Sequence, residues 1–477
     1  MNKIKHYSNY INGSFTESSN RIEVFNPATE ALISTIPDSD DNDVDLALKA
    51  ATDAKRKWSD LAAIERASYL RKISTKIREK SDYLAHVISE EQGKTLELAT
   101  VEVNFTADYI DYMAEWARRI EGEIITSDRA GENIFLFRKP VGVVAGILPW
   151  NFPFFLIARK MAPALITGNT IVIKPSEETP NNCFEFTKLV AEIGLPDGVF
   201  NVVSGRGNIG AALSGSAKVD MISFTGSVKT GENIMAAAAP NITKLNLELG
   251  GKAPAIVLDD ADIDMAVKAI RDSRVINSGQ VCNCAERVYV QRGVAEEFIA
   301  KMTTAMGETR FGDPLIDKNI DMGPLINGQA IVKVQEAVDT AIAQGAKLEC
   351  GGKQADTPKG HYFLPTVLSG CEMSMDIMKI ETFGPVLPIQ VVDSLDEAIE
   401  HSNNCDVGLT SSIFTKDLSK AMRAVNLLEF GETYINREHF EAMQGYHAGM
   451  RKSGLGGADG KHGLYEFLST QVVYMQC

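Results

Sequence analysis

The spacing of hydrophobic and polar residues changes along the chain. Between residues 43 and 90, apolar residues recur at steps of three and four with charged residues between them. This period is typical of amphipathic helices, so we expect the first hundred residues to be mostly helical. From residue 141 onward, short apolar runs alternate with stretches of helical period. The predicted strands are 141–148, 170–173, 199–203, 221–224 and 244–249, and the predicted helices are 154–167, 183–193 and 231–238.

A repeated strand–helix alternation predicts an α/β fold with a parallel sheet and crossover helices. Ligands bind beyond the carboxyl ends of the strands in such sheets. Polar turns follow three of the predicted strands, at residues 149–151, 174–177 and 224–227. Their position predicts a nucleotide site. A second alternating block, roughly residues 251–432, contains Cys282, and residues 470–474 form a short β-prone run.

Composition narrows the class of protein. A chain of 477 residues suggests two or three domains, and its net charge of −15 argues against nucleic acid or an anionic membrane as partner. No apolar run reaches the roughly 20 residues of a membrane span, and the first residues lack the apolar stretch of a signal peptide. The seven scattered cysteines do not form a disulfide framework or a metal site with zinc-like spacing. We therefore expect a cytoplasmic protein without a metal.

One glycine-rich turn matches a dinucleotide fingerprint. Residues 205–210 read Gly-Arg-Gly-Asn-Ile-Gly and lie between a strand-like and a helix-like segment. The acidic residue that usually follows about 20 positions later, to hold the ribose, is missing near Gly226. The turn is therefore either a simple tight turn or part of a nucleotide site.

Four motifs occur in order along the chain: Pro149-Trp150-Asn151-Phe152-Pro153, Phe224-Thr225-Gly226-Ser227, Leu247-Glu248-Leu249-Gly250-Gly251-Lys252 and Gly279-Gln280-Val281-Cys282. Together they resemble the aldehyde dehydrogenase superfamily over nearly the whole chain. The resemblance implies a Rossmann-type NAD-binding domain (1–117 and 141–249), an α/β catalytic domain (250–465) and a small β oligomerisation arm (118–140 and 466–477). It also implies a homotetramer or homodimer built through the arm; the alternative for the tail is a simple edge strand.

The resemblance implies NAD as cofactor. In the family the pyrophosphate lies near the helix that follows the second motif, where free backbone N–H groups favour an anion. Glu177 matches the carboxylate that accepts hydrogen bonds from the adenosine ribose, and Lys174 the ammonium beside it. A carboxylate there repels a 2'-phosphate, which favours NAD over NADP. The complete set of expected cofactor contacts is Leu148, Pro149, Trp150, Asn151, Lys174, Ser176, Glu177, Gly207, Gly210, Phe224, Thr225, Gly226, Ser227, Leu249, Lys333, Glu381 and Phe383.

The same resemblance implies the catalytic residues Cys282, Glu248, Asn151 and Lys174. A cysteine thiolate attacks carbonyls readily and yields a thioester that water can cleave. Cys284 competes as nucleophile, because both cysteines share a face if the local chain is extended. Glu248 is the expected base for hydrolysis, with a pKa raised by its neighbours Leu247 and Leu249. The Asn151 amide and the backbone N–H of Cys282 are the expected oxyanion donors.

A polar set is expected to contact the substrate, namely Asn151, Arg159, Asn283, Glu441 and His447. These residues resemble those of bacterial family members that oxidise short 2-hydroxyaldehydes such as lactaldehyde and glycolaldehyde. Succinate semialdehyde is the alternative, because an arginine suits its distal carboxylate. Two plainer interpretations remain open at this point: Arg159 as an exposed helix charge and His447 as a loop residue. A family member that has lost its activity is the non-enzymatic alternative.

Overall fold

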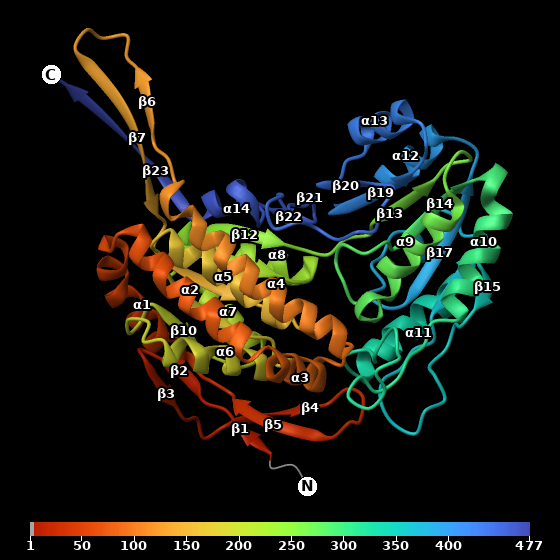
Figure 1. Cartoon of the computed structure of the whole chain (residues 1–477), viewed down its shortest axis with the longest axis horizontal. Helices are drawn as coiled ribbons and strands as arrows, with labels where there is room; N and C mark the ends of the chain where they lie inside the picture. Colours follow the sequence, from red (N-terminus) through yellow and green to blue (C-terminus); the bar gives the residue numbers. More distant parts are fainter. Residues whose placement is uncertain (1–3) are drawn as a thin grey trace.

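Two β-sheets flanked by helices form two lobes that lie side by side (Figure 1). The computed structural model describes residues 4–477. The first sheet has the strand order β22-β12-β11-β8-β9-β10-β2-β3. Its strands are β2 (Asn9–Ile11), β3 (Ser14–Thr16), β8 (Val143–Ile147), β9 (Thr170–Lys174), β10 (Phe200–Val202), β11 (Met221–Thr225), β12 (Lys244–Glu248) and β22 (Gly454–Leu455).

The second sheet has the strand order β15-β16-β17-β14-β13-β19-β20. Its strands are β13 (Pro254–Val257), β14 (Arg287–Gln291), β15 (Lys347–Cys350), β16 (Thr366–Ser369), β17 (Val386–Val392), β19 (Thr410–Phe414) and β20 (Glu432–Ile435). Smaller pairings involve β1 (Lys5–His6), β4 (Arg21–Phe25), β5 (Leu32–Pro37), β18 (Val407–Gly408) and β21 (Met450–Arg451).

Helices cover both sheets. Those of the first lobe are α1 (Asp41–Asp60), α2 (Ala63–Glu79), α3 (Ser81–Gln92), α4 (Leu96–Ala114), α5 (Pro153–Ile166), α6 (Asn181–Glu192), α7 (Gly207–Gly215), α8 (Val228–Ala238) and α14 (Gly460–Glu466). Those of the second lobe are α9 (Ile263–Val275), α10 (Arg292–Gly307), α11 (Gly328–Ala343), α12 (Leu395–Asn403) and α13 (Leu418–Leu427). Short 3-10 helices occur at Glu115–Arg118, Ala239–Asn241, Ile276–Gly279 and Asp376–Met378.

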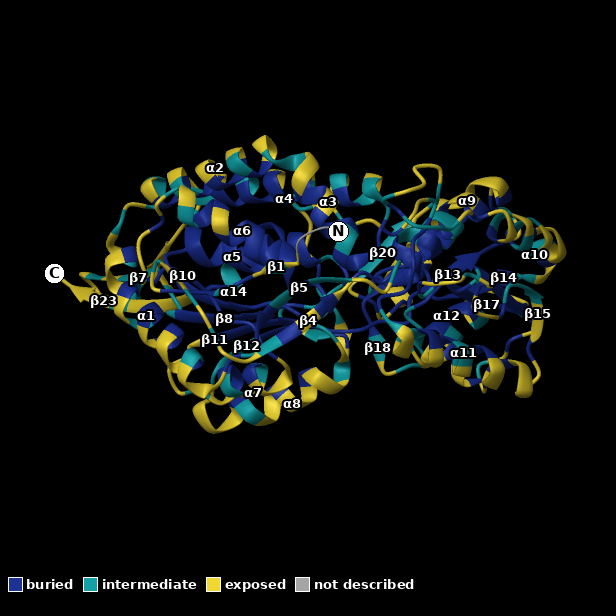
Figure 2. Cartoon of the chain, turned by 90° about the horizontal axis from the view of Figure 1, so that it is seen from below, coloured by how far each residue is buried: buried dark blue, intermediate teal, exposed yellow. Residues whose placement is uncertain are grey.

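The parallel core of the first sheet confirms the predicted alternation. Strands β12, β11, β8, β9 and β10 pair in parallel with one another in that order. Every residue of β8, β9 and β11 is buried, which explains why these strands appear in the sequence as short continuous apolar runs. Figure 2 shows the buried sheets between helices that are exposed on their outer faces.

Helix α5 is buried along its whole length, from Pro153 to Ile166. It packs against α4 on one side and against the sheet on the other. Two cationic side chains, Arg159 and Lys160, are therefore taken out of water together with the apolar residues around them. A buried charge is tolerated only when it is paired or hydrogen-bonded, so the fold itself requires polar partners around this helix.

The prediction of a mostly helical first hundred residues is wrong for residues 5–37, which form β1 to β5. These strands are only two to six residues long; β2 pairs locally with β3 and β4 with β5, but distant elements also hold the group in place. Strand β2, for example, pairs with β10 through Tyr10 and Val202. Such pairing depends on tertiary contact, which an amphipathic pattern within one segment does not record.

A β-arm projects from the first lobe (Figure 1). It consists of β6 (Glu123–Thr126), β7 (Glu132–Pro140) and β23 (Leu468–Gln476). The carboxyl-terminal strand β23 pairs antiparallel with β7, from Leu468 opposite Pro140 to Gln476 opposite Glu132, which confirms the expected pairing of the tail with the inserted hairpin. The arm carries several exposed apolar side chains: Ile124, Ile125, Phe137, Val472, Tyr474 and Met475. Its role in assembly stays a prediction.

The expected domain division also stays a prediction, with one structural qualification. Strand β22 lies inside the segment assigned to the catalytic domain, yet it pairs with β12 at the edge of the first sheet. The chain thus returns from the second lobe to the first before it reaches the arm.

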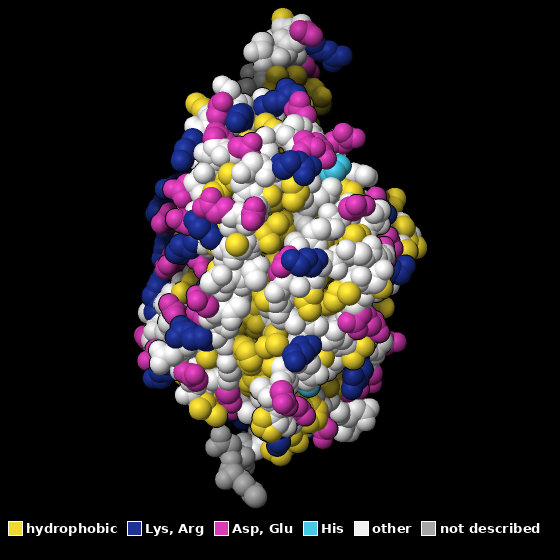
Figure 3. Space-filling model, turned by 90° about the vertical axis from the view of Figure 1, so that its right-hand side faces the viewer, with side chains coloured by type: hydrophobic (Ala, Val, Ile, Leu, Met, Phe, Trp, Pro, Cys, Tyr) yellow, Lys and Arg dark blue, Asp and Glu magenta, His cyan; other side chains and the backbone are white. Residues whose placement is uncertain are grey.

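On the face of the second lobe seen in Figure 3, acidic and basic side chains are interspersed. Over residues 4–477, no helix has the length and apolarity needed to cross a membrane.

Candidate active site

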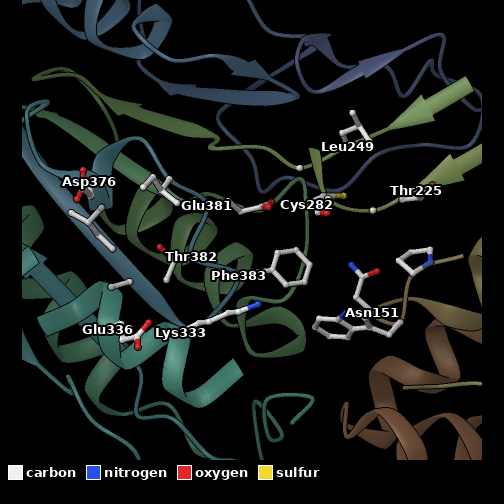
Figure 4. A pocket seen from close by; sticks show the side chains of 18 of the residues that line it. Asn151, Thr225, Leu249, Cys282, Lys333, Glu336, Asp376, Glu381, Thr382 and Phe383 are labelled. Atoms are coloured by element: carbon white, nitrogen blue, oxygen red, sulfur yellow. The ribbon is translucent and has the colours of Figure 1, made fainter. Parts of the chain in front are cut away.

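A cavity of about 580 Å³ lies where the two lobes face each other. Figure 4 shows side chains of both lobes projecting into it, among them Glu381 and Phe383 opposite Cys282 and Asn151. The rings of Trp150 in the first lobe and Phe383 in the second lie edge to face, with their centroids 5.4 Å apart. The cavity is lined by these residues that the sequence predicted for the catalytic and cofactor sites: Pro149, Trp150, Asn151, Thr225, Gly226, Ser227, Glu248, Leu249, Cys282, Lys333, Glu381 and Phe383.

A second, narrower pocket of about 70 Å³ opens on the other side of Cys282. Cys282, Asn151 and Thr225 line both spaces, so the candidate nucleophile lies at their junction. The walls of the narrow pocket combine aromatic and polar side chains, among them Phe105, Phe152, Phe155, Phe440, His439, Arg159, Asn283 and Glu441. The sequence interpretation missed the aromatic residues and His439, whose pattern alone does not distinguish a pocket wall from a core position.

The loop that carries Cys282 follows a strained turn. Asn277 and Ser278 have positive φ values of 46° and 58°, a conformation that costs an L-residue about 1–2 kcal/mol. Side-chain contacts hold the turn in place: Ser278 Oγ donates to Gly323 O at 2.7 Å, and Gln280 Oε1 accepts from Ile326 N at 2.9 Å. Gly279 has φ 74°, and a Cβ there would lie 2.3 Å from Gly384 O. The backbone geometry therefore requires the glycine of the Gly-Gln-x-Cys motif, and the contact with Ile326 explains its glutamine.

The two neighbouring cysteines have different surroundings. Cys282 is partly exposed at the cavity, whereas Cys284 is buried and donates its thiol hydrogen to Val281 O at 2.9 Å. The chain turns at these residues, so they do not share the face of an extended strand. Burial raises the pKa of Cys284 to about 12. Burial also raises the pKa of Cys282, but the nearby His447 opposes that rise. The structure thus favours Cys282 as the nucleophile.

Glu248 ends β12 and is buried beside the cavity. Its carboxylate accepts a hydrogen bond from Thr225 Oγ1 at 3.0 Å, and Lys160 Nζ donates to the same hydroxyl at 2.8 Å. The Arg159 guanidinium lies 3.8 Å from the carboxylate.

The expectation of a raised Glu248 pKa is wrong. Burial acts in that direction, but the charges of Lys160, Arg159 and His447 outweigh it and hold the pKa below its ordinary value. Helix α5 brings two of these cations to the end of β12, a contact that Leu247 and Leu249 in the sequence do not reveal. Glu248 is therefore ionised at neutral pH and ready to accept a proton.

Asn151 is fixed from beneath by a buried ion pair. Lys94 Nζ lies 2.6 Å from Glu102 and donates to the backbone oxygen of Asn151 at 2.8 Å. Glu102 also accepts hydrogen bonds from the N–H groups of Phe154 and Phe155 at 2.9 and 3.0 Å, in the first turn of α5. The Asn151 amide donates to Gln280 O at 3.0 Å, in the loop of the nucleophile. An amide has two N–H donors, so one remains for a substrate oxygen.

Arg159 is not an exposed helix charge. Its guanidinium donates to Asp459 at 3.1 and 2.5 Å and to Glu441 at 3.0 Å. Asn283 in turn donates to Glu441 at 2.5 Å. Asp459 is a partner that sequence analysis missed, since it is 300 positions away from Arg159. The available signal was indirect, because a buried arginine requires a carboxylate partner.

His447 is a buried residue rather than a free loop residue, with only 2% of its side chain exposed. Its Nδ1 lies 2.6 Å from Glu432 Oε1, another residue that sequence analysis missed. Among residues 4–477, the side chains that line the narrow pocket do not include His447. The structure therefore brings Arg159, Asn283 and Glu441 to the pocket wall and leaves His447 outside that wall, where its charge lowers the pKa of Cys282.

The remaining cofactor candidates lie at the carboxyl ends of the parallel strands. Lys174 and Glu177 form an ion pair of 3.2 Å after β9, and Gly210, in α7, is close to the Lys174 side chain. Ser227 caps α8 by accepting a hydrogen bond from Thr230 N, which leaves a helix N-terminus facing the cavity. Leu148, Lys174, Ser176, Glu177, Gly207, Gly210 and Phe224 lie outside the cavity lining at Cys282. A helix N-terminus facing the cavity, a carboxylate at the end of a neighbouring strand and a cavity of this size fit a dinucleotide.

Comparison with known proteins agrees with this site. A model of the aldehyde dehydrogenase family matches residues 15–473. The chain belongs to this family. It is 62% identical to lactaldehyde dehydrogenase of Escherichia coli strain K12 over 470 residues, which cover 98% of each protein.

Solved structures of family members show the same fold. The crystal structure of the lactaldehyde dehydrogenase from Escherichia coli superposes with a TM-score of 0.98, at 61% identity over 100% of both chains. A betaine aldehyde dehydrogenase from Staphylococcus aureus, solved in complex with NAD+, has a TM-score of 0.96 at 35% identity, over 98% of this chain and 94% of that one. The protein is thus an aldehyde dehydrogenase whose relatives include an NAD+-binding enzyme.

The two cysteines should differ in function. Replacing Cys282 with Ser should lower aldehyde-dependent NADH production by at least about a thousandfold, because a hydroxyl is a far weaker nucleophile than a thiolate. Cys284→Ser is the matched control and should keep most of the activity, since serine can make the same hydrogen bond to Val281 O. Equal losses in the two variants would remove the distinction drawn from their surroundings.

The cations of α5 should set the pH dependence of Glu248. Lys160→Met removes the largest charge that lowers the Glu248 pKa, so that pKa should rise and more of the carboxylate should be protonated in weak acid. The acid limb of activity should therefore move to higher pH, by about one unit if the lost interaction is about 1.4 kcal/mol. Steady-state hydrolysis of p-nitrophenyl acetate between pH 4.5 and 8 measures this limb without a cofactor. Lys188→Met, at a half-exposed lysine of α6, is the control and should leave the acid limb of the pH profile unchanged. An unchanged acid limb in Lys160→Met would contradict the assignment of this limb to Glu248.

Proposed function

We propose that this aldehyde dehydrogenase oxidises a short 2-hydroxyaldehyde, lactaldehyde or glycolaldehyde, to its carboxylic acid with NAD. The observation that carries the proposal is the state of Arg159. Its guanidinium already binds two carboxylates, Asp459 and Glu441, and lies near a third, Glu248. It therefore has no surplus charge for the distal carboxylate of succinate semialdehyde.

The narrow pocket supports a small, neutral, hydroxylated substrate. Its volume of about 70 Å³ leaves little room for a long aldehyde. Glu441 stands at its wall as a hydrogen-bond acceptor held by Arg159 and Asn283, which suits a substrate hydroxyl. The 62% identity to a lactaldehyde dehydrogenase points to the same substrate class.

The chemistry begins at Cys282. Its thiolate sulfur forms a bond to the aldehyde carbon, and the carbonyl oxygen takes the electron pair of the broken π-bond. The Asn151 amide and the backbone N–H of Cys282 stabilise that oxygen, and loss of one such donor typically costs about 10²–10³-fold in rate. NAD, when bound, supplies the acceptor for the hydride that leaves this carbon, and the acyl group remains on Cys282 as a thioester.

Glu248 completes the cycle. It takes a proton from water as the water oxygen bonds to the thioester carbon, and the thiolate of Cys282 then leaves with the C–S electron pair. A lowered pKa keeps Glu248 in the acceptor form through this step. The presence of this base favours hydrolysis over transfer to another thiol, and the arranged catalytic residues favour an enzyme over a non-catalytic family member.

Four side chains are the proposed holders of the dinucleotide. Glu177 and Lys174 would hold the adenosine ribose, and Glu381 and Phe383 the nicotinamide end. Burial and the neighbouring Glu286 raise the pKa of Glu381 to about 8, so this group can act as a hydrogen-bond donor in its protonated form. The Glu177 carboxylate supports NAD over NADP, because it would repel a 2'-phosphate.

Assembly and location belong to the same proposal. The exposed apolar side chains of the arm support a homotetramer or homodimer. All seven cysteines are free thiols, which fits the reducing conditions of the cytoplasm.

A substrate panel tests the activity. We expect kcat/KM for lactaldehyde and glycolaldehyde to exceed that for succinate semialdehyde and for a long-chain aldehyde by at least about tenfold, the factor that one or two misfitted groups produce. Initial rates of NADH formation measure it. A preference for succinate semialdehyde would show that Arg159 is available to a distal carboxylate, and the hydroxyaldehyde assignment would be wrong.

Cofactor preference is tested at Glu177. Glu177→Gln removes the charge that repels a 2'-phosphate, so the ratio of kcat/KM with NAD to kcat/KM with NADP should fall by about tenfold, equivalent to 1.4 kcal/mol. Glu178→Gln is the control, because Glu178 is a neighbouring carboxylate that accepts a hydrogen bond from Asn327. An unchanged ratio in the Glu177 variant would place the source of the preference elsewhere.

A further inference from the structure

Buried His447 and partly buried Glu432 form a pair that the proposed mechanism does not use. Glu432 begins β20, and its Oε1 lies 2.6 Å from Nδ1 of His447. Its other carboxylate oxygen accepts a hydrogen bond from the Tyr434 hydroxyl. Only 14% of the Glu432 side chain and 2% of the His447 side chain are exposed. Both oxygens of Glu432 are therefore occupied, and its orientation is fixed.

The backbone of His447 is fixed as well. Its N–H donates to Ala458 O at 2.9 Å, and its carbonyl accepts from Ala458 N at 2.8 Å. With Nδ1 directed at Glu432, Nε2 is the ring nitrogen that remains for another partner, and the charge of His447 lowers the pKa of the nearby Cys282 thiol. The Glu432 carboxylate thus keeps a proton on Nδ1 of His447 and fixes the orientation of the ring, as carboxylates do for other functional histidines.

We propose that Glu432 is a positioning residue that keeps His447 protonated and aimed at Cys282, so that the imidazolium stabilises the catalytic thiolate. This inference rests on the proposed role of Cys282 as nucleophile. In the ion-pair form, the proton of the thiol is on the free ring nitrogen of His447 and the electron pair is on Sγ. No redox change is involved.

The charges around the Glu432–His447 pair explain why His447 needs a carboxylate partner to stay protonated. Burial raises the pKa of the Cys282 thiol, and the carboxylates Glu441 and Glu381 act in the same direction. His447 is the group that opposes them. Burial and the neighbouring Arg159 lower the pKa of His447. Cys282 and Glu432 raise it by more, so the pKa of His447 is well above its ordinary value. The other charged groups that face this histidine are Glu248, Glu441 and Asp459.

Alkylation of Cys282 tests the proposal directly. The rate of iodoacetamide modification is followed from pH 5 to 10 on the Cys282 peptide by mass spectrometry, because this rate reports the thiolate fraction. Glu432→Gln should raise the midpoint of the alkylation rate against pH by about one unit. It should also slow alkylation at neutral pH about tenfold, the change that one lost charge interaction of about 1.4 kcal/mol produces. The matched control is Glu429→Gln, at a side chain that is 61% exposed and pairs only loosely with Arg451 at 3.8 Å; its midpoint should equal that of the unmodified enzyme.

A double-mutant cycle separates charge transmission from a packing change. His447→Gln should also raise the midpoint, and adding Glu432→Gln to that variant should change nothing further, because the carboxylate acts through the imidazole. A midpoint that stays put in Glu432→Gln, or that shifts equally in the His447→Gln background, would overturn the proposal. If Glu432→Gln does not fold, an unshifted midpoint in His447→Gln alone is sufficient to overturn it. The assay needs neither aldehyde nor cofactor, so a wrong substrate assignment would leave its result unchanged.

Discussion

The geometry of the site depends on one buried ion pair, Lys94 with Glu102. Both side chains are fully buried, and removing one partner of such a pair typically costs about 3–5 kcal/mol, because the other is left as an uncompensated charge. Lys94 holds the backbone of Asn151, and Glu102 holds the first turn of α5. The oxyanion donor and the helix that supplies the site's cations are thus anchored by the same contact.

Charge balance at the nucleophile follows from that anchoring. The buried and partly buried charged groups around Cys282 are the cations Arg159, Lys160 and His447 and the carboxylates Glu248, Glu432, Glu441 and Asp459. Arg159 and His447 are paired with carboxylates, and Lys160 donates to the Ser223 and Thr225 hydroxyls. Arg159, the cation at the pocket wall, is therefore not left free to attract an anionic substrate. The same balance keeps Glu248 ionised, and His447 within it opposes the rise that burial causes in the pKa of Cys282. Substrate choice and the activation of the catalytic groups therefore share one electrostatic origin.

The fold was largely predictable where strands are buried in a parallel core. Runs such as 141–148 and 221–224 are apolar because helices cover both faces of the sheet, and they appear as β8 and β11. The amino-terminal strands escaped prediction because they are only two to six residues long. Runs this short carry no clear alternating period, although most of these strands pair locally with one another, and β2 also pairs with the distant β10.

The sequence by itself determined the nucleophile motif at Cys282, the family and the alternation of strands and helices around the cavity. These features depend on local backbone requirements, such as the glycine needed at position 279, and on apolar periodicity. Only the tertiary structure decided the direction of the Glu248 pKa, the carboxylate partners of Arg159 and the Glu432–His447 contact. Burial and charge proximity control these properties, and the residues concerned are brought together from segments as much as 300 positions apart.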